Sequence, residues 1–578
     1  MSGMFSGIAR ASLAASAVAA ICAAAMAGPA SQPGKAVAQP AIPAIQVVPV
    51  IPKELNPGAG GAPAATLAQA AAFAWQEFIG LSWPAATSDA SGKPLRDTPD
   101  PTCLLGDTRA RCAAQPLTWQ TLRGKAEIFT NNASDPNYNS PPNYNGRYAS
   151  GDPQPCAGPA PAQAPWVNLD ETTQIFEDAM YAGVAPTYTS VNSQPQLIRF
   201  LAKANRAEFT YYNQLLNLPG GIGPVQANTK AKLKTVGTPP PGSLTYISLP
   251  TNTIEMKAGW RMLTTTEQAS GRFHTARVRY YEPFSSHTSP VASCYYEGVW
   301  GLVALHIIQK TATAPYFIYA TFEQADNITN AAGAPIEDVN GAAPGGGLPP
   351  TTPALTFQDT ATVSASKVPP RVIRTGGAPF CTPAKRLYYR NLISAALPTG
   401  GPICVNSRYN AIPATIIAAN QTAHAAIAAY NSRNGIRSSP WSYYKLINVQ
   451  YRPYSDDTPA APFAGNDPTT GNNPQNFYLA NIVVETNRPL QMFSGSLVNG
   501  NPGTGSNSNY DSQFGGPPGN GVHRNLYYSP PGMLKPKGYN MGGCMGCHGA
   551  QGQAGGGDFS VILARGAVGD PDNPPQVP

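Results

Sequence analysis

Charge and histidine are both scarce in this sequence. Charged side chains account for 12% of the 578 residues, and 6 residues are histidine. The 38 basic and 31 acidic residues leave a formal net charge of +7, which is a mild excess for a chain of this length. Lysine and arginine do not cluster anywhere, so we expect no nucleic-acid partner.

The sequence also lacks the motifs of several large enzyme classes. It contains no P-loop, no dinucleotide-binding fingerprint and no His-Glu-x-x-His zinc motif, and it shows no recognisable Ser/His/Asp pattern. An Ala-rich stretch near the N-terminus is too short to cross a bilayer comfortably, and no later segment is apolar enough to span a membrane. These absences disfavour kinases, dehydrogenases and hydrolases, and they predict that the protein has no integral membrane span.

Glycine and proline, in contrast, are abundant. The 56 glycines and 61 prolines make up about a fifth of the chain. Such a composition predicts many turns and long irregular connections rather than long helices. Short segments with strand-like patterns are interspersed with a few helical patterns. The sequence therefore predicts an α+β fold with largely antiparallel strands, a few helices and extensive Gly/Pro-rich loops.

The first 62 residues have the features of an export signal and a tether. Residues 1–27 contain a single basic residue, Arg10, then an Ala-rich apolar stretch, and they end with small residues at Ala25 and Ala27. This pattern is typical of a cleaved secretory signal. Residues 28–62 are rich in Ala and Pro, which predicts a flexible linker. We expect a periplasmic or secreted protein with a large mixed α/β, disulfide-containing domain at 63–497 and a separate C-terminal segment at 498–578.

Several secondary-structure elements are expected along the large domain. The first is a helix at 66–81, with Phe73, Trp75, Phe78 and Ile79 on its buried side and Glu77 as a surface or capping charge. Strands 299–310 and 315–323 are expected to pair through the turn between them. Further helices are expected at 195–217 and 414–431, and further strands at 243–250, 273–283, 443–452 and 477–487.

The most informative motif lies close to the C-terminal end. Cys544, Cys547 and His548 form the pattern Cys-x-x-Cys-His, which is typical of covalent haem attachment. Two thiols at this spacing can each form a thioether with one vinyl group of a porphyrin, and the next imidazole can reach the iron. Two alternatives remain. A zinc site would need a fourth ligand, and the two cysteines could instead form a disulfide.

Through these five residues the chain resembles the c-type cytochromes. More loosely, the large N-terminal portion, the segments GLVALHIIQKT and ATFEQADN, and the late MGGCMGCHG are similar to those of exported bacterial monohaem cytochromes. The resemblance implies one covalently attached haem c in segment 498–578, held through Cys544 and Cys547, with His548 as the proximal axial ligand. It covers only the attachment site. Because no Met, His, Lys, Cys or Tyr follows the motif, any sixth ligand comes from upstream.

The candidates for a distal ligand are His306, Met533 and His523. His523 and Met533 lie on a Gly/Pro-rich connection that is long enough to fold over the haem, whereas His306 lies in an apolar strand. The alternatives are that His306 is a hydrogen-bonded core histidine and that the iron has an open position. For the other histidines, we expect His424 to be either a core residue or a ligand, and His274 and His287 to be surface or turn residues. The charged residues Arg524, Lys535 and Lys537 either pair with haem propionates or are solvated.

The remaining cysteines predict disulfides. Of the 9 cysteines, Cys22 lies in the signal and two lie in the motif, which leaves an even number for an oxidising compartment. Two pairs are close in the sequence, and the two cysteines that remain would form the third pair. The expected pairs are Cys103–Cys112, Cys381–Cys404 and Cys156–Cys294, with the alternative that some of these cysteines stay reduced.

Together these features predict an exported monohaem c-type cytochrome that transfers single electrons to or from periplasmic redox partner proteins. One alternative is a haem-dependent, peroxidase-like enzyme with an open distal site, in which His306 acts with Glu323 or Asp326. Another is a secreted binding protein whose haem is structural or sensing. The sequence does not identify a small-molecule substrate.

Overall fold

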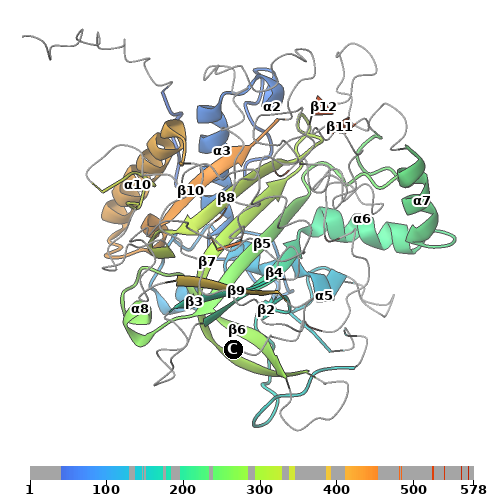
Figure 1. Cartoon of the computed structure of the whole chain (residues 1–578), viewed down its shortest axis with the longest axis horizontal. Coiled ribbons are helices and arrows are strands. Elements are labelled where there is room, and N and C mark those ends of the chain that lie inside the picture. Colours follow the sequence, from blue (N-terminus) through green and yellow to red (C-terminus); the bar gives the residue numbers. More distant parts are fainter. Residues whose placement is uncertain are drawn as a thin grey trace, which may run out of the picture. The chain divides into compact units, whose positions relative to one another are not determined.

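A ten-stranded, mainly antiparallel sheet lies at the centre of the fold (Figure 1). Its strands follow the order β10-β8-β7-β5-β4-β3-β9, with β1 beside β4, β6 beside β7, and β2 paired in parallel with β6. The expected α+β fold with largely antiparallel strands is confirmed. The strands of this sheet are β1 (Arg123–Gly124), β2 (Val167–Leu169), β3 (Asp178–Gly183), β4 (Gln196–Ala204), β5 (Ile254–Met262), β6 (Thr275–Pro283), β7 (Ser293–Gln309), β8 (Ile318–Gln324), β9 (Arg386–Asn391) and β10 (Tyr444–Gln450).

The structure, a computed structural model, describes part of the chain. The described residues are 41–128, 137–145, 148, 151–172, 178–183, 196–232, 239–283, 293–327, 337–344, 386–391, 411–452, 481, 483–484, 524–525, 539–540, 544, 562 and 571. For 178–183, 196, 230, 232, 283, 386–391, 524–525 and 539–540 only the backbone is described. Among the described residues, no helix has both the length and the apolar character needed to cross a membrane.

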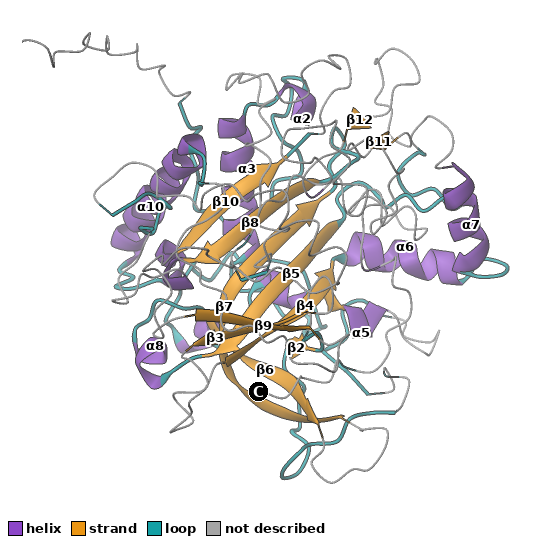
Figure 2. Ribbon diagram, viewed as in Figure 1, coloured by secondary structure: helices purple, strands orange, loops and turns teal. Residues whose placement is uncertain are grey.

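Helices surround this sheet (Figure 2). They are α2 (Gly61–Ala64), α3 (Leu67–Leu81), α4 (Ala110–Ala113), α5 (Lys125–Ile128), α6 (Arg206–Leu216), α7 (Ile222–Lys232), α8 (Thr265–Ala269) and α10 (Ala414–Asn434). Three 3-10 turns, η1 (Thr118–Thr121), η4 (Ala325–Asn327) and η5 (Pro440–Tyr443), and a small sheet of β11 (Arg524–Asn525) with β12 (Tyr539–Asn540) complete the described elements.

Helix α3 confirms the first predicted helix. Thr66 caps it, because its hydroxyl accepts a hydrogen bond from the Gln69 amide at 3.2 Å while the Gln69 side chain accepts one from the Thr66 amide at 2.8 Å. Its ring-bearing residues Trp75 and Phe78 pack on Phe322 of β8, with ring centroids 5.2 and 4.4 Å away. Helix α3 therefore covers one face of the sheet at its β8–β10 end, where it also contacts α10.

Glu77 does not lie on the surface, contrary to prediction. Helix α3 is buried nearly all round, and Glu77 is 1% exposed. Neither oxygen of its carboxyl group has a hydrogen-bond partner among the described residues. Burial raises its pKa well above the ordinary value of a glutamate. The helical period predicts a solvent-facing acid, but only Gln69 and Gln76 of this helix are partly exposed.

Helix α10 confirms a second prediction and closes the outer edge of β10. The side-chain amide of Asn420 accepts from the Leu446 amide at 3.0 Å and donates to the Leu446 carbonyl at 2.9 Å, as a neighbouring strand would. The indole of Trp75 donates to the same Asn420 oxygen at 2.9 Å. Gly435 ends the helix in the left-handed conformation, with φ of 68°. The edge of the sheet is thereby shielded from pairing with another strand.

Two predicted elements are wrong, and a third differs at the few positions where it is described. The segment predicted as one helix at 195–217 is strand β4 followed by helix α6. Because β4 lies between two strands and is mostly buried on both faces, its apolar run resembles a helical pattern. Residues 243–250 form turns, and the Tyr211 hydroxyl donates to the carbonyl of Tyr246 there at 3.0 Å. Within 477–487, the described Val483 and Val484 lie in a turn, where the Val484 amide donates to the Asn481 carbonyl at 3.1 Å.

The other predicted strands are confirmed as β6, β7, β8 and β10. Strands β7 and β8 pair antiparallel through the turn that connects them, as predicted. Two predicted disulfides are also present: Cys103–Cys112 closes a short loop, and Cys156–Cys294 joins the loop before β2 to the start of β7. The third predicted pair, Cys381–Cys404, lies outside the described residues.

Candidate functional site

The attachment motif is described at one of its three functional positions. Cys544 has helical backbone conformation, is half-buried and packs against the hydrophobic core. It belongs to neither of the two disulfides. Ile562, further along the same segment, is buried in that core. Cys547 and His548 lie outside the described residues, so their roles stay predictions.

His306 is buried in the middle of the central sheet. It lies on β7, opposite Lys257 of β5 and Thr321 of β8, and Thr321 is opposite Asn448 of β10. Side chains that are directly opposite in antiparallel strands share a face and lie within about 5 Å of each other at Cβ. This cross-strand row therefore brings an ammonium, an imidazole, a hydroxyl and an amide together on one face.

The next row adds charges to the same face. Glu323 of β8 is opposite Lys445 of β10, and the Lys445 ammonium lies 2.6 Å from a carboxylate oxygen of Glu337. Lys445 and Glu337 are both buried. Buried charges are rare unless they are paired in this way. Glu255 lies two residues before Lys257 on β5 and therefore shares its face. We define the polar face of the sheet by this set of side chains: Glu255, Lys257, His306, Thr321, Glu323, Lys445 and Asn448.

A residue near the end of the large domain contacts the polar face. The Asn481 side chain donates to the Thr321 hydroxyl at 3.2 Å and to the Phe322 carbonyl at 2.9 Å. Asn481 is itself buried. The chain thus returns to this part of the sheet before the segment that carries the attachment motif.

His424 is a structural residue. Its Nε2 lies 2.8 Å from the Tyr444 carbonyl and its Nδ1 lies 2.7 Å from the side-chain amide of Asn340. Burial is the main cause that lowers its pKa. The Tyr444 carbonyl oxygen only accepts, so Nε2 donates to it, while Nδ1 faces the side-chain oxygen of Asn340. Since both nitrogens are engaged, His424 helps to close the β10 edge.

His274 is not a surface or turn residue, contrary to prediction. Its ring is stacked on Trp441 at a centroid distance of 5.2 Å, and its Nε2 lies 2.9 Å from the side-chain amide of Gln120. Because the Gln120 oxygen accepts from the Leu117 amide at 2.8 Å, its NH₂ group donates to His274. Burial lowers the pKa of His274 to about 3. The ring is therefore neutral, with its proton on Nδ1.

The acidic residues proposed to act with His306 differ in their surroundings. The carboxylate of Asp326 is held by Arg272, with distances of 2.7 and 2.5 Å, at the end of β8. Glu323 lies on the polar face with His306, one row away. The other sequence candidates, His523, Met533 and His287, together with Lys535 and Lys537, lie outside the described residues.

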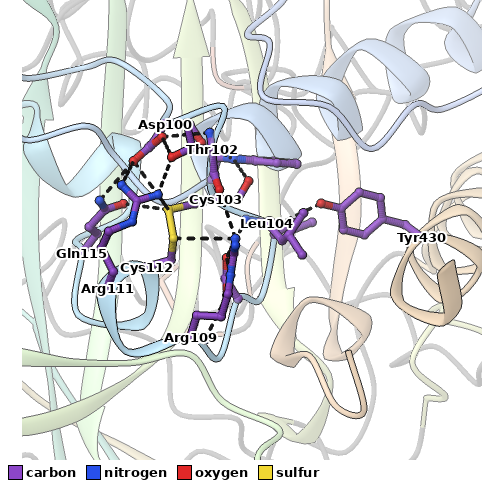
Figure 3. Close-up of a disulfide and its surroundings, with 12 residues drawn as sticks. Asp100, Thr102, Cys103, Leu104, Arg109, Arg111, Cys112, Gln115 and Tyr430 are labelled. Carbon is purple, nitrogen blue, oxygen red and sulfur yellow. Dashed lines mark hydrogen bonds and ion pairs between the residues drawn. A yellow bond between two sulfur atoms is a disulfide. The ribbon is translucent and has the colours of Figure 1, made fainter. Parts of the chain in front are cut away.

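A second polar cluster surrounds the Cys103–Cys112 disulfide (Figure 3). The Arg111 guanidinium lies 3.6 Å from the Cys103 sulfur, and the Arg109 guanidinium lies 3.9 Å from the Cys112 sulfur. The Gln115 oxygen lies 3.4 Å from the Cys103 sulfur. Such a disulfide, with polar atoms directed at both sulfurs, was not foreseen from the sequence.

The same cluster brings two sulfurs and a carboxylate within 4.8 Å of one another, but it does not suit a metal ion. The two sulfurs are already joined in the disulfide. The carboxylate of Asp107 is held by the Arg109 side chain, whose Nε lies 2.9 Å from one oxygen. The hydrogen bond from Arg109 is the main cause that lowers the pKa of Asp107 to about 2.

Comparison with known proteins leaves the family open. No family model, no curated protein and no solved structure matches this chain.

Sequence reasoning identified His306 and Glu323 but missed the rest of the polar face. One signal was available in β8, where Thr321 and Glu323 alternate with Ala320 and Phe322, as expected for a strand with one polar face. Along β10 the alternation is broken by an irregularity between Leu446 and Asn448, which hides the pattern.

Proposed function

We propose that the protein is an exported monohaem c-type cytochrome that exchanges single electrons with periplasmic redox partner proteins. The observation that carries the proposal is the motif Cys544-x-x-Cys547-His548. Cys544 and Cys547 would bind the haem covalently, and His548 would be its proximal axial ligand. The bound haem would supply a one-electron iron couple whose potential depends on the axial ligands.

Two structural observations support the proposal. The disulfides Cys103–Cys112 and Cys156–Cys294 are typical of a protein that folds outside the cytoplasm, where haem c is attached. Cys544 lies against the hydrophobic core, so a group attached there would sit beside the folded domain rather than on a remote tail.

Among the distal-ligand candidates, His306 is the one whose surroundings are described. It is buried on a central strand and flanked by Lys257 and Thr321, so its ring is held by the sheet. His523 and Met533 stay alternatives. For the peroxidase-like alternative, Asp326 is a poor partner of His306, because Arg272 already holds its carboxylate.

The test is to produce the exported protein together with the haem c maturation machinery and to record spectra of the oxidised and reduced forms with and without carbon monoxide. We expect a Soret band and haem that stays on the chain after denaturation. Cys544→Ala and Cys547→Ala should each abolish attachment through two thioethers. The matched control is Cys103→Ser with Cys112→Ser, which removes cysteines outside the motif and should leave the haem in place. Protein without a Soret band would refute the proposal.

The distal position has its own test. If His306 binds the iron, His306→Ala should convert a low-spin spectrum to a high-spin one that responds to carbon monoxide. Thr321→Ala is the matched control, because it truncates the cross-strand neighbour and removes no iron ligand. An unchanged spectrum in His306→Ala would reject His306 as the ligand.

A further inference from the structure

The surroundings of the two described disulfides differ in kind. Arg111, Gln115 and Asp100 all approach the Cys103 sulfur, at 3.6, 3.4 and 3.5 Å. At Cys156–Cys294, the polar atom closest to a sulfur among the described contacts is the Glu282 carbonyl oxygen, 3.7 Å from Cys294. The first disulfide is therefore surrounded by charged and amide side chains, several of which can interact with a reduced sulfur.

These side chains match what a reduced pair would require. A thiolate on Cys112 would lie beside the Arg109 guanidinium, which also binds the Asp107 carboxylate. The positive charge stabilises a thiolate and the nearby carboxylate opposes it, so the guanidinium is required to offset Asp107. A thiol on Cys103 could donate its hydrogen to the Gln115 oxygen or to the Asp100 carboxylate. Because interactions that favour the reduced form make a disulfide more oxidising, we propose that Cys103–Cys112 is a redox-active disulfide that accepts two electrons from a dithiol donor.

The loop keeps its shape by contacts that do not involve the sulfurs. The Trp83 indole donates to the carbonyls of Asp100 at 3.0 Å and Cys103 at 3.1 Å. The Tyr430 hydroxyl, from α10, accepts from the Leu105 amide at 3.4 Å. Asp107 accepts from the Leu104 amide at 3.0 Å. Reduction of the disulfide therefore leaves the loop attached to the domain.

The disulfide also has a route for an attacking thiolate. Cys103 and Cys112 are buried, but the side chains that contact their sulfurs, Arg109 and Arg111, are 59% and 61% exposed. These two guanidinium groups attract an anionic nucleophile, and their flexible stems can move aside without disturbing the core.

The proposed exchange proceeds in two steps. A donor thiolate attacks the Cys103 sulfur, a mixed disulfide forms, and the bond to Cys112 breaks, so that Cys112 leaves as a thiolate beside Arg109. The second thiol of the donor passes its proton to Cys103 as it attacks the donor sulfur of the mixed disulfide. The donor is oxidised to a disulfide, and the protein holds a thiol at Cys103 and a thiolate at Cys112.

The experiment is a redox titration of the full chain in dithiothreitol buffers of graded ratio, followed by acid trapping, alkylation and peptide mass spectrometry. We expect Cys103–Cys112 to be half-reduced in a buffer at least about tenfold more oxidising than the buffer that half-reduces Cys156–Cys294. Equal midpoints, or the reverse order, would overturn the proposal. The readout is the state of the thiols, so it does not depend on haem.

Variants of Arg109 test the cause. Arg109→Gln should make the disulfide about three- to tenfold harder to reduce and should raise the pH at which Cys112 becomes reactive to alkylation. Arg109→Lys should restore both values in part. Lys93→Gln, which removes an exposed positive charge elsewhere, is the matched control and should match the wild type. If Arg109→Gln leaves the reduction equilibrium and the reactivity profile unchanged, the proposed role of the guanidinium is wrong.

Discussion

The two described disulfides connect the chain over very different distances. Cys103 and Cys112 are 9 residues apart, whereas Cys156 and Cys294 are 138 residues apart. The first closes a loop that is already bound to the domain through Trp83 and other contacts. The second joins a long irregular segment to the strand β7, which runs through the centre of the sheet.

This difference separates structural cross-linking from redox chemistry. A disulfide stabilises a protein mainly by restricting the unfolded chain, and the effect grows with the length of the closed loop. Cys156–Cys294 gains most from that effect and has few polar neighbours at its sulfurs. Cys103–Cys112 gains least and has arginines at both sulfurs. The first pair is therefore suited to holding the fold, and the second to exchange.

Removal of the long cross-link should have the largest effect. Cys156→Ser with Cys294→Ser should lower the free energy of unfolding by about 5 kcal/mol, the loop-entropy value for a loop of more than 100 residues. Urea denaturation followed by tryptophan fluorescence measures it. Without the disulfide, the loop 151–172 should detach from β7 and lose the hydrogen bond from the Cys156 amide to the Tyr295 carbonyl, which is 2.9 Å long. Limited proteolysis should therefore cut within 151–172. If removal of Cys156–Cys294 lowers the free energy of unfolding no more than removal of Cys103–Cys112 does, the comparison is wrong.

Removal of the short cross-link should cost less. Cys103→Ser with Cys112→Ser should lower the free energy of unfolding by about 3 kcal/mol, since the closed loop is short. The native loop should persist, and hydrogen exchange at the Leu105 amide, which donates to the Tyr430 hydroxyl, reports on it. Rapid exchange at this amide in the variant would show that the disulfide, rather than its surroundings, holds the loop.

Both pairings could be predicted from the sequence, but for different reasons. Cys103–Cys112 followed from proximity, and Cys156–Cys294 followed as the remaining pair. The charged surroundings of the first pair could not be predicted in the same way. Asp100, Arg109, Arg111 and Gln115 are close to it in sequence, yet only the turn held by Trp83 and Asp107 directs them toward the sulfurs.

The central sheet shows the same limit. Local pattern was sufficient for α3 and α10, whose ends carry the Thr66 cap and Gly435, and for the strands β8 and β10. Local pattern failed for β4, which is buried on both faces, and for Glu77, whose helix is enclosed. The polar face arises from register between strands far apart in the sequence, such as Lys257 opposite His306, and no single segment encodes such a row.

Trp83 offers a sharper test of the comparison, because it is the contact that makes the short loop independent of its disulfide. Trp83→Phe removes the donor of both hydrogen bonds to the loop and should cost about 2 kcal/mol. In the Trp83→Phe background, removal of Cys103–Cys112 should cost more than in the wild type, since the loop then has fewer attachments. A double-mutant cycle in urea measures this coupling, and strictly additive losses would contradict it.

Substitution of Asp107 should have the smallest effect on the free energy of unfolding, and this effect should depend on pH. Hydrogen bonds from Arg109 lower the pKa of its carboxyl to about 2 in the folded protein, below the value of about 3.9 for an unperturbed aspartate. Its stabilisation is therefore present above about pH 4 and is lost as the pH falls toward 2. Asp107→Asn should lower the free energy of unfolding by about 1 kcal/mol at pH 7 and leave it unchanged near pH 2. Urea titrations between pH 2 and 7 should show the two curves converging on the acidic side. Parallel curves would mean that the ionised Asp107 carboxylate does not stabilise the loop. The Cys103–Cys112 disulfide would then have to hold its loop in place, as Cys156–Cys294 holds the longer segment.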